Sequence, residues 1–192
     1  KMDPSAIPDW CRLPGVTYAS DAMMIPGSWD DSLPLDTAWE DVPNTHPRLA
    51  GTHGTCFRLA REHEIPLMQV IASSSYNPAK YLGETGLKSM QVRGRLQQGM
   101  VADITIFDPK SVKDNATYAR GTLPTTGIPY VIINGKTVVK ESKVLTNINP
   151  GQPIRFPEED SPRFEPLSVD SWKIDFLVSP VDFGGLGSEH IH

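Results

Sequence analysis

The chain has 192 residues, with 18 basic and 23 acidic side chains and a formal net charge of −5. This balance argues against a polyanion-binding surface, so we expect no nucleic-acid partner. No apolar run approaches the ~20 residues of a membrane span, so we expect no membrane partner. The two cysteines, Cys11 and Cys56, are too few for a disulfide framework. Two ordinary thiols are favoured over one bridge, which leaves the compartment open between cytoplasm and periplasm.

The first predicted element is a short buried strand at residues 16–19, because this apolar run is β-branched and aromatic. It ends at Ser20 and Asp21. Residues 22–45 then predict a long irregular loop, with several prolines, five acids and no Lys or Arg. A loop of this length in a compact domain is usually functional or disordered, and its two tryptophans argue against pure disorder.

Three helical segments are predicted next. Residues 52–63 show apolar spacing typical of a helix, and a second helix begins at Pro66 and runs to about residue 73. Asn77 and Pro78 are typical of an N-cap and a first helical position, and Gly83 or Gly86 would end the third helix.

The remaining pattern indicates strands. A short segment around Leu96 precedes a turn, and residues 101–107 predict a buried strand. Residues 130–133 and 136–139 flank an Asn-Gly dipeptide, which predicts a hairpin with a type I′ turn. A charge inside a buried strand must be paired. We therefore expect Asp103 to bond neighbouring backbone or an arginine, Arg93 or Arg95.

Two short polar patterns could carry chemistry. Asp21 follows a predicted strand, and in barrel enzymes the carboxyl ends of strands line the active site. Such a carboxylate can be a metal ligand or a general base, although spacing alone favours a turn aspartate. Arg48, after His46 and Pro47, offers a fork that matches a carboxylate, although a surface ion pair is favoured on spacing alone.

Several motifs together resemble a known family. Residues 93–109 resemble the C-terminal signature of the metal-dependent amidohydrolases, and residues 131–138 resemble the hairpin that follows it. Four further motifs are similar to the N-acyl-D-amino-acid deacylases, and the resemblance spans roughly residues 16–155. These four are Ser20-Asp21, His46-Pro47-Arg48, Val112-x-Asp114-x-Ala116-Thr117 and Gly127-Ile128.

The resemblance implies an α/β fold, the C-terminal part of a (β/α)₈ barrel together with strands of a small β-sandwich. Residues 1–95 would supply the last barrel strand and helices, including the long loop 22–45. Residues 96–155 would belong to the β-sandwich, and residues 156–192 would form an extended tail. The family's metal-binding histidines lie upstream, so the resemblance implies an N-terminal portion of the same enzyme as partner.

The resemblance also implies zinc-dependent hydrolysis of a small-molecule amide, the N-acyl group of a (D-)amino acid. Most zinc ligands would lie outside this chain. Asp21 would move a proton from the attacking water to the leaving amine and could also touch the metal. Arg48 would grip the substrate's α-carboxylate, with Ser20 and His46 beside it as further substrate-binding residues. A homo-oligomer is left open.

Two departures from the family pattern keep other functions open. The loop 22–45 is longer and more acidic than its family counterpart, and Gly51-Thr52-His53-Gly54 replaces the usual Gly-Thr-Phe. Both changes fall near the expected mouth of the active site. The alternatives are an amidohydrolase for a cyclic amide or a dipeptide-like substrate, and a non-catalytic assembly fragment.

Overall fold

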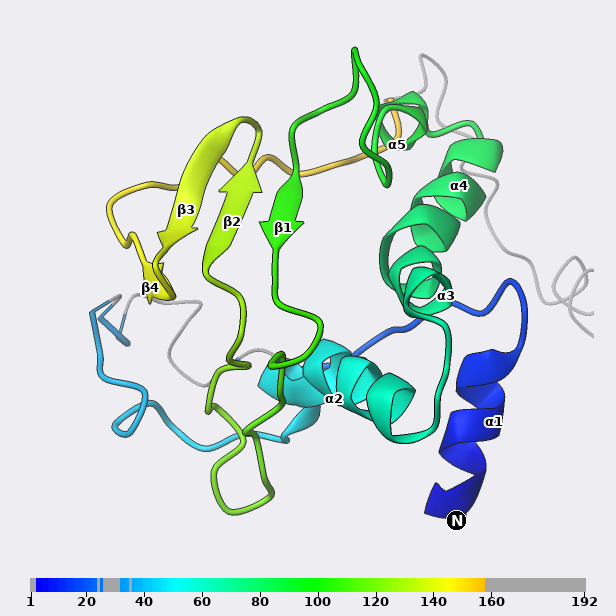
Figure 1. Cartoon of the computed structure of the whole chain (residues 1–192). Helices are drawn as coiled ribbons and strands as arrows, with labels where there is room; N and C mark the ends of the chain where they lie inside the picture. Colours follow the sequence, from blue (N-terminus) through cyan, green and yellow to red (C-terminus); the bar gives the residue numbers. More distant parts are fainter. Residues whose placement is uncertain (1–2, 24, 26–31, 35, 158–192) are drawn as a thin grey trace, which may run out of the picture. The chain divides into compact units, whose positions relative to one another are not determined.

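The computed structural model describes residues 3–23, 25, 32–34 and 36–157 (Figure 1). The chain divides into a unit of residues 1–156 and a second unit, residues 157–192. The predicted tail, residues 156–192, lies outside the described residues except for its first two positions. None of the helices in the described ranges is long and apolar enough to cross a membrane.

The chain begins with a helix that the sequence pattern did not predict. A 3-10 turn, Pro4–Ala6, leads into α1, Ile7–Arg12. Pro8 lies in the first turn of α1, where a missing backbone N–H costs no hydrogen bond. Pro8 therefore suits the start of this helix.

The segment at residues 16–19, predicted to be a buried strand, forms no strand within the described residues. This segment has no regular secondary structure, and the Tyr18 N–H donates to the Ser73 carbonyl at 3.0 Å. A strand is stabilised by the ladder that it forms with a neighbouring strand. In the described ranges the segment lies against a helical region, and none of its residues pairs with a strand.

The second helix, α2, spans Arg48–Glu62 and begins four residues before the predicted start at residue 52. Two buried glycines, Gly51 and Gly54, lower helix propensity in its first turns and mask the signal. The structure needs a small residue at Gly54, because an added Cβ would lie 2.7 Å from Thr125 Oγ1. Close packing, rather than propensity, therefore selects the residue here.

The next two predicted helices form one continuous helical segment. Helix α3, Leu67–Ile71, passes through a π-helical turn, Ala72–Tyr76, into α4, Asn77–Glu84. The Asn77 N–H donates to the Ala72 carbonyl, five residues back. This wider turn accommodates Pro78, which would disrupt a regular α-helix, so the predicted N-cap at Asn77 is wrong.

A short helix and a sheet complete the described elements. Helix α5, Lys88–Gln91, was not predicted, and Leu96 lies in a loop instead of a strand. The sheet is antiparallel in chain order. Its strands are β1 Ile104–Ile106, β2 Tyr130–Ile133, β3 Lys136–Lys140 and β4 Lys143–Val144. The buried strand predicted at residues 101–107 is shorter in the structure, as β1, and two of its three residues are exposed.

The Asn-Gly hairpin is confirmed. Asn134 and Gly135 have φ values of +47° and +75°, as a type I′ turn requires. Asp103 supports this turn, because its carboxylate accepts the Asn134 N–H at 2.8 Å and Arg93 Nε at 3.0 Å. The predicted structural role of Asp103 is thus confirmed, and its two bonds tie the hairpin to the loop after α5.

Helix α2 holds the helical and β parts of this unit together. On one side it contributes to a small buried core, and the Phe57 ring lies 4.8 Å from that of Phe107, just after β1. On another side, Arg58 Nε donates to Asp114 Oδ1 at 2.7 Å. Thr55 Oγ1 donates to Asp114 Oδ2 at 2.8 Å. We call Thr55, Arg58 and Asp114 the α2 clamp.

The α2 clamp also makes the fold sensitive to acid. Burial acts to raise the pKa of Asp114, but the hydrogen bonds from Arg58 and Thr55 outweigh it, so this pKa lies below its ordinary 3.8. The stabilisation is complete well above the ordinary value. It is lost as the pH falls through the lowered pKa of the folded state.

We predict that Asp114→Asn lowers the free energy of unfolding by about 1–2 kcal/mol at neutral pH, because charge-assisted bonds are lost at a partly exposed site. Urea unfolding measures this loss, and the gap to the unsubstituted protein should close on acidification below pH ~4. The control is Glu84→Gln, at an exposed ion pair with Lys80, with an effect below about 0.5 kcal/mol. A gap that stays constant into acid would contradict the assignment.

Candidate functional site

Asp21 follows the irregular segment at residues 16–19, and its own backbone is unusual. Its φ is +48°, a left-handed conformation that aspartate adopts more readily than most residues. The Ala22 N–H donates to Ser20 Oγ at 3.3 Å, which bridges Asp21 from one side to the other. The Asp21 side chain is 90% exposed. This carboxylate therefore points outward, away from the core of the described unit.

Arg48 meets Asp21 across the predicted loop. Arg48 Nη1 lies 3.1 Å from Asp21 Oδ2, so the structure brings together the two residues on which the sequence hypothesis depends. Arg48 is the first residue of α2 and its side chain is 37% exposed. Its Nε is buried without a hydrogen-bond partner in the described part of the chain. The guanidinium thus retains donors that Asp21 does not use.

His46 organises the start of α2. Its Nδ1 accepts the backbone N–H of Arg48 at 3.2 Å, which satisfies a donor of the first turn. Its ring packs edge-on against Tyr118, with centroids 5.1 Å apart. His46 is therefore a positioning residue in this geometry, and it fixes the backbone from which the Arg48 side chain extends.

A distant segment anchors the approach to His46, and sequence reasoning missed it. Asn44 Nδ2 donates to the Tyr118 carbonyl at 3.1 Å, and Asn44 Oδ1 accepts the Gly121 N–H at 2.7 Å. A Cβ on Gly121 would lie 1.8 Å from the Thr45 carbonyl oxygen, so this position requires glycine. The partners are more than seventy residues apart in sequence. In the sequence, only Gly121 could have indicated that two backbone segments approach each other closely here.

The described residues do not form a metal site by themselves. No group of three or more His, Cys, Asp or Glu side chains that could hold a metal occurs within residues 3–23, 25, 32–34 and 36–157. Asp21 offers a single carboxylate next to an arginine. Zinc needs three or four ligands, so the residues described here could supply at most part of its coordination.

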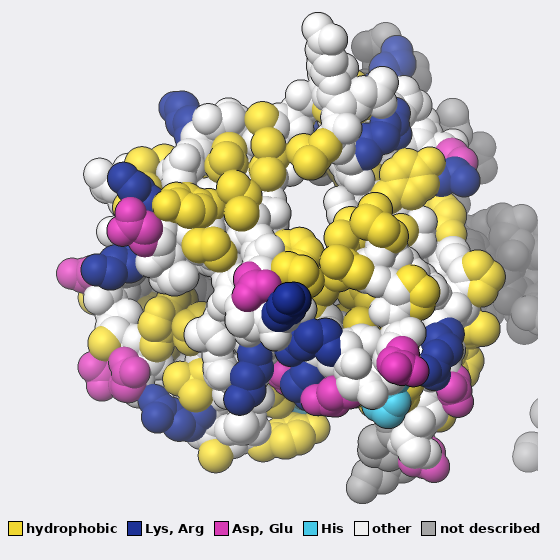
Figure 2. Space-filling view, in the orientation of Figure 1, with side chains coloured by type: hydrophobic (Ala, Val, Ile, Leu, Met, Phe, Trp, Pro, Cys, Tyr) yellow, Lys and Arg dark blue, Asp and Glu magenta, His cyan; other side chains and the backbone are white. Residues whose placement is uncertain are grey.

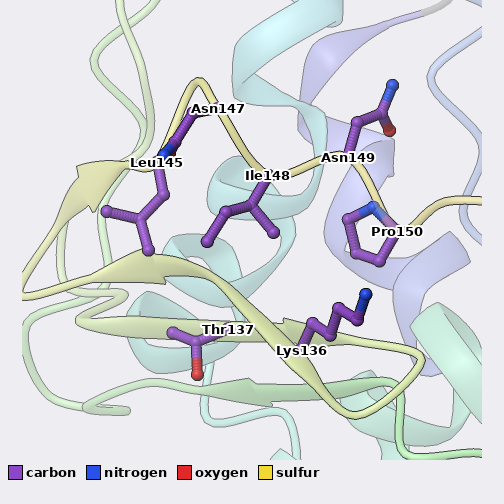
Figure 3. A pocket seen from close by; sticks show the side chains of 7 residues that line it. All are labelled: Lys136, Thr137, Leu145, Asn147, Ile148, Asn149 and Pro150. Atoms are coloured by element: carbon purple, nitrogen blue, oxygen red, sulfur yellow. The ribbon is translucent and has the colours of Figure 1, made fainter.

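A pocket lies elsewhere, between β3 and the loop after β4 (Figure 3). Its volume is about 530 Å³. Leu145 and Ile148 extend from the loop toward the strand that carries Thr137 (Figure 3). Among the described residues that line it, Lys136 is the one charged side chain, and none of the predicted site residues contributes. The lining offers no acid–base pair, so we place the candidate site at Asp21 and Arg48.

Large hydrophobic side chains are exposed on the helical part of the unit. Figure 2 shows them gathered over α3 and α4. The side chain of Met68 is 70% exposed, and those of Tyr76, Tyr81 and Leu82 are also exposed. Contiguous apolar surface of this kind often marks contact with another protein surface.

Comparison with known proteins gives several related sequences, although no protein-family model matches the chain. It is 33% identical over 114 residues to an N-acyl-D-glutamate deacylase of Alcaligenes xylosoxydans xylosoxydans, covering 58% of this chain and 21% of that protein. A D-aminoacylase of the same organism is 34% identical over 113 residues, with 58% and 21% covered. The chain spans about one fifth of the length of these relatives.

Solved structures agree with the sequence matches. An N-acyl-D-glutamate deacylase from Bordetella bronchiseptica, complexed with zinc and a phosphonate inhibitor, has a TM-score of 0.56 and 29% identity. The match covers 71% of this chain and 25% of that one. A D-aminoacylase with a binuclear metal centre has a TM-score of 0.59 at 24% identity, covering 75% and 26%, and supports the fold alone. The resemblance is thus confirmed: over the matched residues this chain is related to part of the N-acyl-D-amino-acid deacylases.

Proposed function

We propose that this chain is part of a zinc-dependent amidohydrolase that hydrolyses the amide bond of N-acyl-D-amino acids. The observation that carries the proposal is the 3.1 Å contact between Asp21 and Arg48 in a chain related to deacylases. A proton acceptor and a carboxylate-binding fork at one place are the groups that such a reaction needs from a protein.

In this proposal the chain forms the C-terminal part of a (β/α)₈ barrel and of a small β-domain. Residues 1–95 supply the last barrel strand, at residues 16–19, and the last helices. Residues 96–155 supply the small domain, with the antiparallel sheet as its described strands. The segment at residues 16–19 forms no strand pairs in the described unit, so in this proposal its neighbouring strands lie elsewhere in the enzyme.

An N-terminal portion of the same enzyme would cover the exposed apolar side chains of α3 and α4. Met68, at 70% exposure, is the clearest of them. Burying apolar area stabilises an interface by roughly 25 cal/mol per Å². The same portion would supply the zinc ligands, because the described residues form no metal site of their own.

Each residue of the site then has a role. Zinc, when bound, lowers the pKa of water to about 7. The exposed Asp21 carboxylate accepts a proton from the attacking water and returns it to the leaving amine. Arg48 binds the substrate's α-carboxylate through donors that Asp21 leaves unused. Ser20 supports the backbone at Asp21, and His46 holds the first turn of α2.

A second candidate keeps the reaction and changes the substrate to a cyclic amide or a dipeptide-like molecule. The acidic loop 22–45 favours it, because acids without any Lys or Arg select cationic groups over carboxylates. The third reading, a non-catalytic assembly fragment, rests on the high exposure of Asp21.

We expect Asp21→Asn in the complete enzyme to lower kcat by about 100-fold or more, because a positioned acid–base group contributes 10²–10⁴. Bound zinc, measured by elemental analysis, should be retained. Asp9→Asn is the matched control, since Asp9 is also exposed and paired with an arginine, Arg12, on α1. Unchanged turnover in Asp21→Asn would refute the proton-transfer role.

Arg48→Ala should raise KM for an N-acyl amino acid by roughly 10- to 100-fold, the worth of one charge-assisted contact. The corresponding amide without a free carboxylate should be turned over equally by both proteins. Arg48→Lys keeps the charge but lacks the two-pronged guanidinium, so its KM should lie between those of the unsubstituted enzyme and Arg48→Ala. An equal loss on both substrates would show that Arg48 acts only through folding of α2.

A substrate screen separates the candidates. The zinc-loaded complete enzyme is assayed with N-acyl-D-amino acids, N-acyl-L-amino acids and cyclic ureides by amine release. We expect the D-compounds to give the highest kcat/KM. A clear preference for the cyclic compounds would replace the deacylase with the second candidate. No hydrolysis of any compound would favour the assembly fragment.

A further inference from the structure

We propose that Cys11 and Cys56 are a redox pair, which an oxidant of the small-disulfide class converts to an intramolecular disulfide joining α1 to α2. Composition alone favours two ordinary thiols. The fold adds an observation that sequence spacing could not provide, because the two cysteines, from different helices, share one small core.

The surroundings of the two sulfurs favour pairing with each other. Cys11, on α1, is 6% exposed and belongs to a buried cluster with Ala60, Ile65 and Val70. Cys56, on α2, packs against this cluster and remains partly exposed. Cys56 therefore lies against the same cluster that contains Cys11. An oxidant can therefore reach Cys56 first, with Cys11 as its neighbour.

Bonds that do not involve sulfur hold α1 in place beside α2. The Cys11 carbonyl accepts Gln69 Nε2 at 3.1 Å and the Tyr18 hydroxyl at 3.3 Å. The Arg12 guanidinium donates to the His63 carbonyl just after α2. These contacts hold the backbone of Cys11 in place beside α2, so the proposed bond depends on the side chains reaching each other from fixed helices.

The pair should remain reduced until an oxidant is present. Burial, and next the neighbouring Cys11, raise the pKa of the Cys56 thiol to about 12. Few thiolates are present at neutral pH, so exchange is slow compared with that of an activated cysteine. The same burial protects the finished disulfide from reductants. These are the properties of a stabilising bridge rather than of a catalytic thiol.

The exchange balances with oxidised glutathione as the oxidant. The Cys56 thiolate attacks one glutathione sulfur, which breaks the glutathione disulfide and releases one glutathione thiolate. The Cys11 thiolate then attacks Cys56 Sγ, forms the Cys11–Cys56 bond and releases the second. Two electrons pass to glutathione, and the two cysteine protons end on the two released thiols.

The test uses the complete polypeptide, equilibrated in buffers of increasing oxidised-to-reduced glutathione ratio. Each sample is acid-quenched, alkylated and mapped by mass spectrometry. We expect a peptide that links Cys11 to Cys56 to replace the two alkylated peptides. Its mass should be two hydrogens less than the sum of the two peptides with free thiols. The oxidised protein should melt about 5 °C higher than the reduced one, because a cross-link constrains the unfolded chain.

Cys11→Ser and Cys56→Ser are the matched controls, and each should abolish both the linked peptide and the thermal shift. If either variant fails to fold, the peptide map of the unsubstituted protein still decides. Alkylation of both cysteines at every ratio, or separate glutathione adducts on each, would overturn the proposal. The result is independent of the proposed hydrolase, because peptide mapping needs neither zinc nor substrate.

Discussion

The charge-assisted bonds between Arg58 and Asp114 are the interaction on which the described unit depends. They join α2 to the segment that leads from β1 to β2, through a carboxylate that is only 14% exposed. Helix α2 carries Arg48 at its first residue and Cys56 in its middle. A side chain can act at a fixed place only if its helix is fixed, so the α2 clamp supports both the candidate site and the cysteine pair.

The faces of α2 explain this double use. Gly51, Gly54, Thr55 and Arg58 recur at spacings of three and four, so they share one face, which packs against residues 114–125. Cys56 and Ala60 share another face, which closes the core with α1. The first face consists of glycines and polar side chains, and the second is apolar. Helix α2 therefore connects a polar loop region to a hydrophobic cluster while the rest of its surface stays exposed.

The sequence predicted those features that depend on residues adjacent in the chain. The Asn134-Gly135 turn was predictable, because its φ values are a property of two residues. The pairing of Asp103 was also predictable, although this residue lies just before β1 and is exposed, not inside a buried strand. The early start of α2 and the contacts of Asn44 were not, because both depend on residues far away in the sequence. The resemblance assigned Asp21 and Arg48 to one site, but their ion pair was not predicted, since a long loop separates them in the sequence.

The exposure of Asp21 sets the condition for the proposed chemistry. An ion pair in open water contributes little, because solvent screens it and competes for the same hydrogen bonds. The same pair gains strength when water is excluded, since the local dielectric falls. In the proposed function, a carboxylate that is 90% exposed therefore needs another part of the enzyme to close over it. The exposed apolar residues of α3 and α4 are also available for contact with that part, so the proposed chemistry and the packing both point to a surface beyond the described residues.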